Sequence, residues 1–176
     1  MFFSVKELEL KKVRFETAFP PGEIQYDQGL SQVTPLETQG TAELLANTLG
    51  EIRIRGHVQV GMEAPCDRCL EPAKFPIDAN FDLFYRPAAR AGYAEEVEID
   101  EGESEIAFYE GGGIELKDVL REFILLSMPM QRKCREDCLG ICPVCGQSRN
   151  LAKCACEPKP EDDRWAALKK LQVKGL

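Results

Sequence analysis

Long apolar runs are missing from this chain of 176 residues. No stretch approaches the ~20 consecutive apolar residues that a membrane-spanning helix needs, which argues against a transmembrane protein. The first residues turn charged at Lys6 and lack a cleavage site of small residues, so no signal peptide is expected. These absences predict a cytoplasmic protein that has no membrane partner.

Histidine is almost absent, and its scarcity limits the catalysis that the chain can support. The one histidine, His57, lies on the polar side of a predicted strand and is expected to be solvated rather than catalytic. The glycine run at 111–113 lacks the Lys, Ser or Thr of a phosphate-binding loop. We therefore predict that the protein is not an enzyme and has no small-molecule substrate.

Positive charge is also in deficit, with 22 Lys and Arg against 30 Asp and Glu, a formal net charge of -8. An acidic surface repels phosphate backbones, so general nucleic-acid binding is disfavoured and a basic protein partner is favoured. Local clusters of basic residues nevertheless lie beside the cysteines described below. The predicted contacts with a partner or with RNA are Arg68, Arg132, Lys133 and Arg135.

Cysteine, by contrast, is abundant and clustered. Six of the eight cysteines lie between Cys134 and Cys156, and the other two form a C-x-x-C pair at Cys66 and Cys69. They are surrounded by Pro, Gly and charged residues, which argues against simple core packing. Because thiols are kept reduced in the cytoplasm, the pattern favours zinc over disulfides.

Structural zinc takes four thiolate or imidazole ligands, so eight cysteines can supply one or two Zn²⁺ sites. One predicted set is Cys142, Cys145, Cys154 and Cys156. The other predicted set is Cys66, Cys69, Cys134 and Cys138. Two alternatives stay open, a chain without metal and a single site with the other cysteines as free thiols. The ligands of that single site are Cys134, Cys138, Cys142 and Cys145.

Alternating hydrophobicity predicts an α+β fold, namely a mainly antiparallel β domain with one long helix, a C-terminal zinc-binding segment and a short C-terminal helix. The clearest strands, 50–62 and 73–86, form a hairpin with the C-x-x-C pair at its turn, and Gly56 marks a bulge. Further strands are expected at 8–19, 24–26, 36–47 and 105–109.

Helical spacing predicts one helix near 114–127 and another after a charged linker, starting near Asp162 or Asp163. Three parts of the chain follow from this pattern. They are a β-rich domain with its helix (1–130), a cysteine-rich zinc-binding segment (131–158) and a linker with the C-terminal helix (159–176).

Several motifs in combination resemble a known family. In order they are P-C-x-R-C-L-E-P (Pro65–Pro72), a helix exit (Leu126–Met130), C-x-x-D-C-x-G-x-C-P-x-C-G (Cys134–Gly146), a C-x-C pair, and D-x-R-x-x-x-L (Asp162–Leu168). Over about residues 50–170 the chain resembles the YceD family of large ribosomal RNA subunit accumulation proteins. It departs in small ways, with Ser148-Arg149-Asn150 where an Asn-Leu-Asn-like run is common and Asp163 where Pro is common.

The resemblance implies a non-enzymatic factor for accumulation or maturation of large-subunit ribosomal RNA. Its implied partners are a ribosomal precursor particle, a ribosomal protein or rRNA. Some members lack most of the C-terminal cysteines, so the metal segment is not essential to the function that the family shares. Two alternatives come from the residues: a thiol-based redox or metal-sensing protein, and a nuclease-like enzyme that processes rRNA.

Overall fold

The computed structural model describes residues 1–27, 29–48, 50–88 and 106–156. Within them the chain has an α+β fold, a mainly antiparallel sheet with two helices. In chain order the elements are β1 (Phe2–Ser4), α1 (Val5–Leu10), β2 (Val13–Phe19), β3 (Ser31–Gln32), β4 (Leu36–Leu44), β5 (Ile52–Pro65), β6 (Pro72–Pro87), β7 (Ile106–Tyr109), β8 (Gly113–Glu115) and α2 (Leu116–Ser127).

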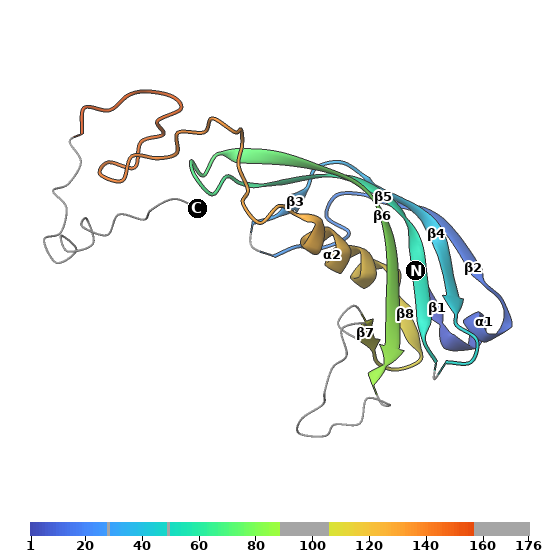
Figure 1. Cartoon of the computed structure of the whole chain (residues 1–176). Coiled ribbons are helices and arrows are strands. Elements are labelled where there is room, and N and C mark those ends of the chain that lie inside the picture. Colours follow the sequence, from blue (N-terminus) through green and yellow to red (C-terminus); the bar gives the residue numbers. More distant parts are fainter. Residues whose placement is uncertain (28, 49, 89–105, 157–176) are drawn as a thin grey trace, which may run out of the picture.

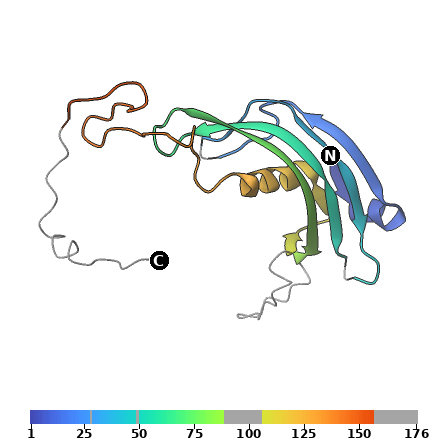
Figure 2. The same ribbon diagram turned by 45° about the horizontal axis from the view of Figure 1, so that its top comes forward.

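Six strands form the main sheet in the order β2-β4-β5-β6-β7, with β3 pairing the part of β5 that extends past β4. Every pairing in this sheet is antiparallel except that of β6 with β7. Two shorter strands, β1 and β8, pair separately. The sheet arches over α2, so that its concave face meets the helix (Figures 1 and 2).

Alternation along β5 explains which face of the sheet is buried. Ile54, Val58 and Met62 have essentially no exposed surface, whereas the polar Arg55, His57 and Gln59 at alternate positions are not buried. Helix α2 has apolar residues at three- and four-residue spacing, including the buried Leu120 and Ile124. These two periodicities place the hydrophobic core between the sheet and the helix.

The β5–β6 hairpin is the longest feature of the sheet and carries the first cysteines. Its register runs from Ile52 opposite Tyr85 to Pro65 opposite Pro72, which leaves residues 66–71 as the turn. The predicted hairpin with the C-x-x-C pair at its tip is therefore confirmed. The tip projects beyond α2 toward the cysteine-rich segment, drawn in orange and red (Figure 1).

The predicted bulge at Gly56 is wrong, because the β5 register is unbroken through that residue. Gly56 pairs with Gly40 in β4, and a Cβ added to Gly56 would lie 2.3 Å from the carbonyl oxygen of Gln39. The rings of Phe15 and Phe81 lie over the two glycines instead. Glycine here permits close approach of two backbones, not an extra residue in the strand.

The N-terminal prediction is corrected in two places. Residues 8–10 belong to α1, where Leu8 is buried, and the strand begins only at Val13. No strand forms at Ile24, although its side chain is buried; the short strand lies later, at Ser31–Gln32. Gln32 fixes that loop because its side-chain amide donates hydrogen bonds to the carbonyls of Phe19 and Thr34.

The predicted helix near 114–127 is found at Leu116–Ser127, and residues 114 and 115 belong to β8 instead. Helix α2 has 12 residues, which is an ordinary length, so it is not the long helix that was predicted. The strand expected at 36–47 is confirmed as β4. The predicted C-terminal helix and the acidic residues between 95 and 105 lie outside the described residues. Within the described residues, no helix is long and apolar enough to cross a membrane.

Candidate metal centre

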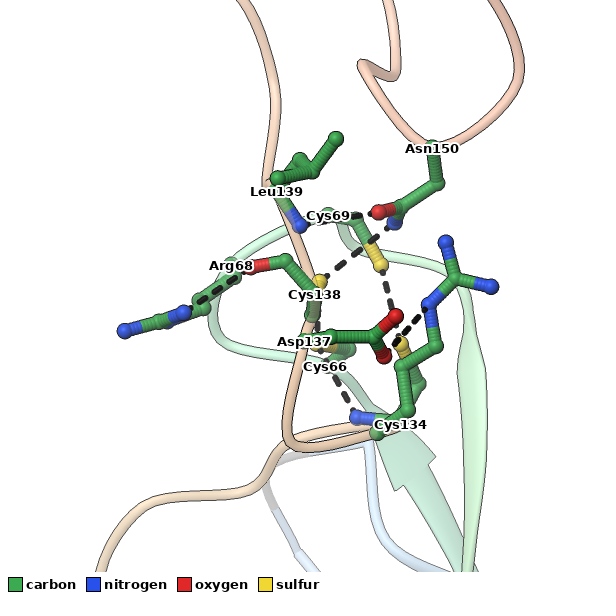
Figure 3. A network of polar contacts seen from close by, with 9 residues as sticks. Cys66, Arg68, Cys69, Cys134, Asp137, Cys138, Leu139 and Asn150 are labelled. Atoms are coloured by element: carbon green, nitrogen blue, oxygen red, sulfur yellow. Dashed lines mark hydrogen bonds and ion pairs between the residues drawn. The ribbon is translucent and has the colours of Figure 1, made fainter.

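Two chain segments that are far apart in sequence meet at the tip of the β5–β6 hairpin. Cys66 and Cys69 come from the hairpin turn, and Cys134 and Cys138 come from the chain that follows α2 (Figure 3). Their four sulfur atoms lie within 4.8 Å of one another. We call this set the first cluster. Three of its members are buried, and Cys134 is partly exposed.

The hairpin turn is shaped to present its two sulfurs on one side. The Leu70 N–H donates to the Cys66 carbonyl at 2.9 Å, and the Cys66 N–H donates to the Glu71 carbonyl at 2.9 Å. Leu70 takes a left-handed conformation, with φ of 62°, to close this turn. Glycine is the residue that usually occupies such a position, so the leucine is an exception to the rule.

Backbone dipoles favour thiolate at one end of the first cluster. Burial raises the pKa of Cys66, but hydrogen bonds from the backbone N–H groups of Cys69, Arg68 and Cys134 outweigh it and lower the pKa to about 6. Burial and neighbouring thiols instead raise the pKa of Cys134 to about 12. Four thiolates this close repel one another, so all four ionise together only when a cation compensates their charge.

A second cluster lies entirely within the cysteine-rich segment. Its sulfur atoms also lie within 4.8 Å of one another, and its members are Cys142, Cys145, Cys154 and Cys156. Only Cys142 is buried. The Gly146 N–H donates to the Cys142 carbonyl at 2.8 Å, and Gly146 has φ of 74°, which closes the predicted knuckle. Hydrogen bonds from the N–H groups of Cys145 and Val144 lower the pKa of Cys142 to about 6.

The structure therefore groups the cysteines into the two predicted sets of four and not into the alternative single set that joined Cys134 and Cys138 to Cys142 and Cys145. Both clusters could hold metal ions. The C-x-x-C pair at Cys66 and Cys69 lies in a strand turn, not at the start of a helix, and faces two further cysteines.

The basic residues predicted to contact a partner all surround the first cluster. Arg68 donates to the carbonyl of Cys138 at 2.8 Å, and Arg132 forms an ion pair with Asp67 at 3.4 Å. Lys133 pairs with Glu136 at 3.8 Å, and Arg135 pairs with Asp137 at 3.3 Å. The first two contacts join the chain after α2 to the hairpin, whereas the other two lie within the chain after α2.

Sequence reasoning missed two residues of this network. Asp67 accepts a hydrogen bond from the Arg132 N–H at 2.7 Å, and Asn150 donates one to the Cys138 sulfur at 3.4 Å. The Asp67 contact joins residues 65 apart in the chain, and the Asn150 contact joins residues 12 apart. Spacing alone carries no signal for either residue.

The outer face of the sheet, on the side opposite α2, carries paired charges and lies apart from both clusters. His57 pairs with Asp78 at 2.7 Å and belongs to neither cysteine cluster, as expected for a solvated strand residue. A shallow hollow of about 840 Å³ opens on this face and includes Arg14 and Arg55 in its lining. Within the described residues, these two exposed arginines have no ion-pair partner.

Comparison with known proteins bears on both the hairpin and the clusters. A family model described as "Large ribosomal RNA subunit accumulation protein YceD" matches residues 54–172, from β5 past both clusters. The chain belongs to the YceD family. The match covers more than half of the sequence and includes all eight cysteines.

Among curated relatives, a chloroplastic YCED homolog 1 of Zea mays is 26% identical over 133 residues, covering 62% of this chain and 45% of the maize protein. Uncharacterised proteins of Mycobacterium tuberculosis and Mycobacterium bovis are each 27% identical over 150 residues, covering 82% of this chain and 64% of the relative. The chain thus spans about half to two thirds of the length of these relatives. No solved structure matches.

Proposed function

We propose that this chain supports the accumulation of large-subunit ribosomal RNA during ribosome assembly, as a non-enzymatic binding factor in the cytoplasm. The observation that carries the proposal is membership of a family named for that role, with the match running through the hairpin and both clusters. The partners are a ribosomal precursor particle, a ribosomal protein or the rRNA itself. The test is depletion of the protein with separate measurement of large- and small-subunit rRNA. Equal loss of both would contradict the proposal.

The metal in the clusters is zinc in this proposal. A tetrahedral ion with zinc–sulfur bonds of about 2.3 Å places its sulfurs about 3.8 Å apart. In the first cluster, the Cys69 and Cys134 sulfurs lie 3.6 Å apart, and those of Cys66 and Cys138 lie 3.9 Å apart. This spacing suits one tetrahedral ion in the first cluster, and the sulfurs of the second cluster also lie within 4.8 Å of one another. Elemental analysis of the purified protein should find about two zinc ions per chain, and iron in their place would contradict the assignment.

Contact with RNA is proposed at the cysteine-rich end of the molecule. Residues 138–156 contain no Asp or Glu, although the chain as a whole is acidic. Arg149 and Lys153 are exposed there and have no ion-pair partner among the described residues. The exposed ion pairs around the first cluster contribute at most about 1 kcal/mol each, so phosphate can displace them.

Crosslinking to precursor rRNA tests this surface. Replacing Arg149 and Lys153 with Glu should greatly reduce the yield, because it reverses two charges that attract phosphate. The matched control replaces Arg14 and Arg55 with Glu on the outer face of the sheet, with the same change in net charge. Equal loss in both variants would show a general electrostatic effect and refute this contact surface.

The non-enzymatic assignment is supported by where the reactive side chains lie. All eight cysteines belong to clusters suited to metal, and His57 is paired with Asp78 outside them. Incubation of the metal-loaded protein with precursor rRNA should leave the RNA intact. Discrete cleavage products, absent from a mock-purified control, would replace this assignment with that of a processing nuclease.

A thiol-based redox or metal-sensing role is the second candidate, and the exposure of Cys145 and Cys156 favours it. Counting reactive thiols under native conditions separates the two functions. Closed metal sites leave few thiols open to an alkylating reagent, whereas a redox pair leaves at least two.

A further inference from the structure

Asn150 contacts the first cluster from the chain between two members of the second, Cys145 and Cys154. Its side-chain nitrogen donates a hydrogen bond to the Cys138 sulfur, a member of the first cluster, at 3.4 Å. Its side-chain oxygen accepts one from the backbone N–H of Leu139 at 2.9 Å. Figure 3 shows the residue reaching Cys138 and Leu139 from a separate loop. One side chain therefore fixes both the sulfur of Cys138 and the backbone that follows it.

The loop that carries Asn150 belongs to the second cluster. It leaves Cys145 and returns at Cys154, so both of its ends are members of that cluster. Its own contacts are mostly polar, including a hydrogen bond from the Arg149 N–H to the Gly140 carbonyl at 2.8 Å. Leu151, its largest apolar side chain, is 80% exposed. With so little buried surface, the loop depends on its two ends being held together.

The hydrogen bond from Asn150 orients the sulfur of Cys138, a proposed metal ligand. Donors to a metal ligand orient it and stabilise its charge, and their removal typically weakens metal binding by about 10- to 100-fold. The contact forms only when the loop is closed over Cys138. Anything that opens the loop removes this donor from the first cluster.

We infer that Asn150 is a positioning residue through which metal bound at the second cluster strengthens metal retention at the first. The inference rests on the proposed metal binding and goes beyond it, because two independent sites would satisfy that proposal equally well. Coupling between binding sites is reciprocal, so metal at the first cluster also stabilises the closed loop of the second.

Metal release from the full-length protein tests the coupling. The protein is loaded with Zn²⁺, or with Co²⁺ to follow the thiolate absorbance, and mixed with excess chelator. The wild-type protein should release two ions in two phases, the exposed second cluster first. Asn150→Leu should accelerate the slow phase roughly tenfold or more, because it removes the donor to Cys138. Asn150→Asp, which keeps an acceptor for Leu139 but removes the donor, should do the same.

A control variant separates this effect from general loosening of the loop. Ser148→Ala removes a hydrogen bond from the same loop to Glu71, at 2.9 Å, but touches no cysteine. It should leave the slow phase within about twofold of wild type, because no donor to a metal ligand is lost. Circular dichroism of each variant checks that the sheet is intact.

The second half of the test empties the second cluster. Replacing Cys145 and Cys156 with Ser should accelerate release of the remaining ion to a similar degree, and adding Asn150→Leu should then have little further effect. If the two ions are released independently, and Asn150→Leu or the serine variant matches wild type in the slow phase, the coupling is overturned. Zinc binding itself would then still stand. A wild-type protein that holds no metal would overturn both.

Discussion

Leu70 and Gly146 stand at equivalent positions, each directly after the second cysteine of a C-x-x-C pair, and both take positive φ, 62° and 74°. For glycine this conformation is free of steric cost, whereas for other residues it costs roughly 1–2 kcal/mol. Leu70 is 65% exposed and gains little from burial. The first knuckle is therefore the more strained of the two.

Reciprocal substitutions should have opposite effects on stability. Leu70→Gly should leave stability unchanged or raise it by up to about 1 kcal/mol, because relief of strain exceeds the entropy that glycine adds to the unfolded chain. Gly146→Ala should lower it by about 1 kcal/mol, although nothing lies within 4 Å of the added carbon. Thermal unfolding of zinc-saturated protein measures both. Destabilisation by Leu70→Gly would show that the exposed leucine makes a contact of its own.

Tyr26 predicts how stability responds to alkaline pH. Burial raises its pKa from 10.0 to about 12, against a smaller opposing effect of Arg121. Between these values the unfolded chain loses the phenol proton while the folded chain keeps it, so stability should fall as the pH rises. Its hydroxyl is buried without a hydrogen-bond partner among the described residues. Tyr26→Phe should reduce the loss of stability between pH 10 and 12 and leave stability at pH 7 unchanged. Unfolding of the variant and of the wild type across that pH range measures the difference.

At the scale of elements, the pairing of Gly40 with Gly56 shows where β4 and β5 come closest. The nearest atom that an added Cβ would meet is a backbone carbonyl oxygen, that of Arg55 at Gly40 and that of Gln39 at Gly56, which cannot easily move aside. The two phenylalanine rings above the glycines complete the core face that a pair of ordinary residues would have filled.

Gly56→Ala should therefore destabilise the protein strongly, at or above the upper end of the roughly 1–3 kcal/mol typical of overpacking. Gly112→Ala is the matched control, because no atom lies within 4 Å of its added carbon and its φ is ordinary. It should lie within about 0.5 kcal/mol of wild type. Denaturant unfolding measures both, and similar values for the two variants would show that the strands separate at low cost.

Sequence periodicity predicted those elements whose hydrophobic pattern matches the face that is buried in the folded protein. The alternation in β5 and β6 and the helical spacing in α2 reflect a buried face, which any sheet-and-helix packing requires. The short α1 was predicted as strand because Leu8 alone marks its buried side. Ligand counting predicted both clusters, since two knuckles and two remaining pairs exhaust eight cysteines. Asp67 and Asn150 could not be predicted, because each contacts a residue that only tertiary folding brings near it, 65 and 12 residues away in the chain.

On the scale of the whole molecule, the sheet and the cysteine-rich segment have separate sources of stability. The core between the sheet and α2 contains no cysteine, while Cys66, Cys69 and Cys138 pack in a small cluster of their own with Ala73. Metal therefore contributes to the order of the cysteine-rich segment and little to that of the core between the sheet and α2.

Metal removal should thus act on one end of the protein. A chelator should open the region around 131–156 to trypsin, which cleaves after Lys and Arg, while the far-ultraviolet circular dichroism of the sheet is retained. Restoring Zn²⁺ before protease should restore protection, whereas Mg²⁺ should not, because thiolates bind it poorly. Loss of the sheet signal on chelation would show that the two regions unfold as one.

The first cluster joins sulfurs that stand 65 and 72 residues apart in the chain. During synthesis Cys66 and Cys69 emerge well before the residues that complete their set. At about 5–20 residues per second, the pair waits roughly 3–13 s for Cys134. For that interval a nascent chain carries a two-thiol site that cannot yet enclose an ion. The order of synthesis therefore places closure of this centre after the β5–β6 hairpin and α2 have both been made.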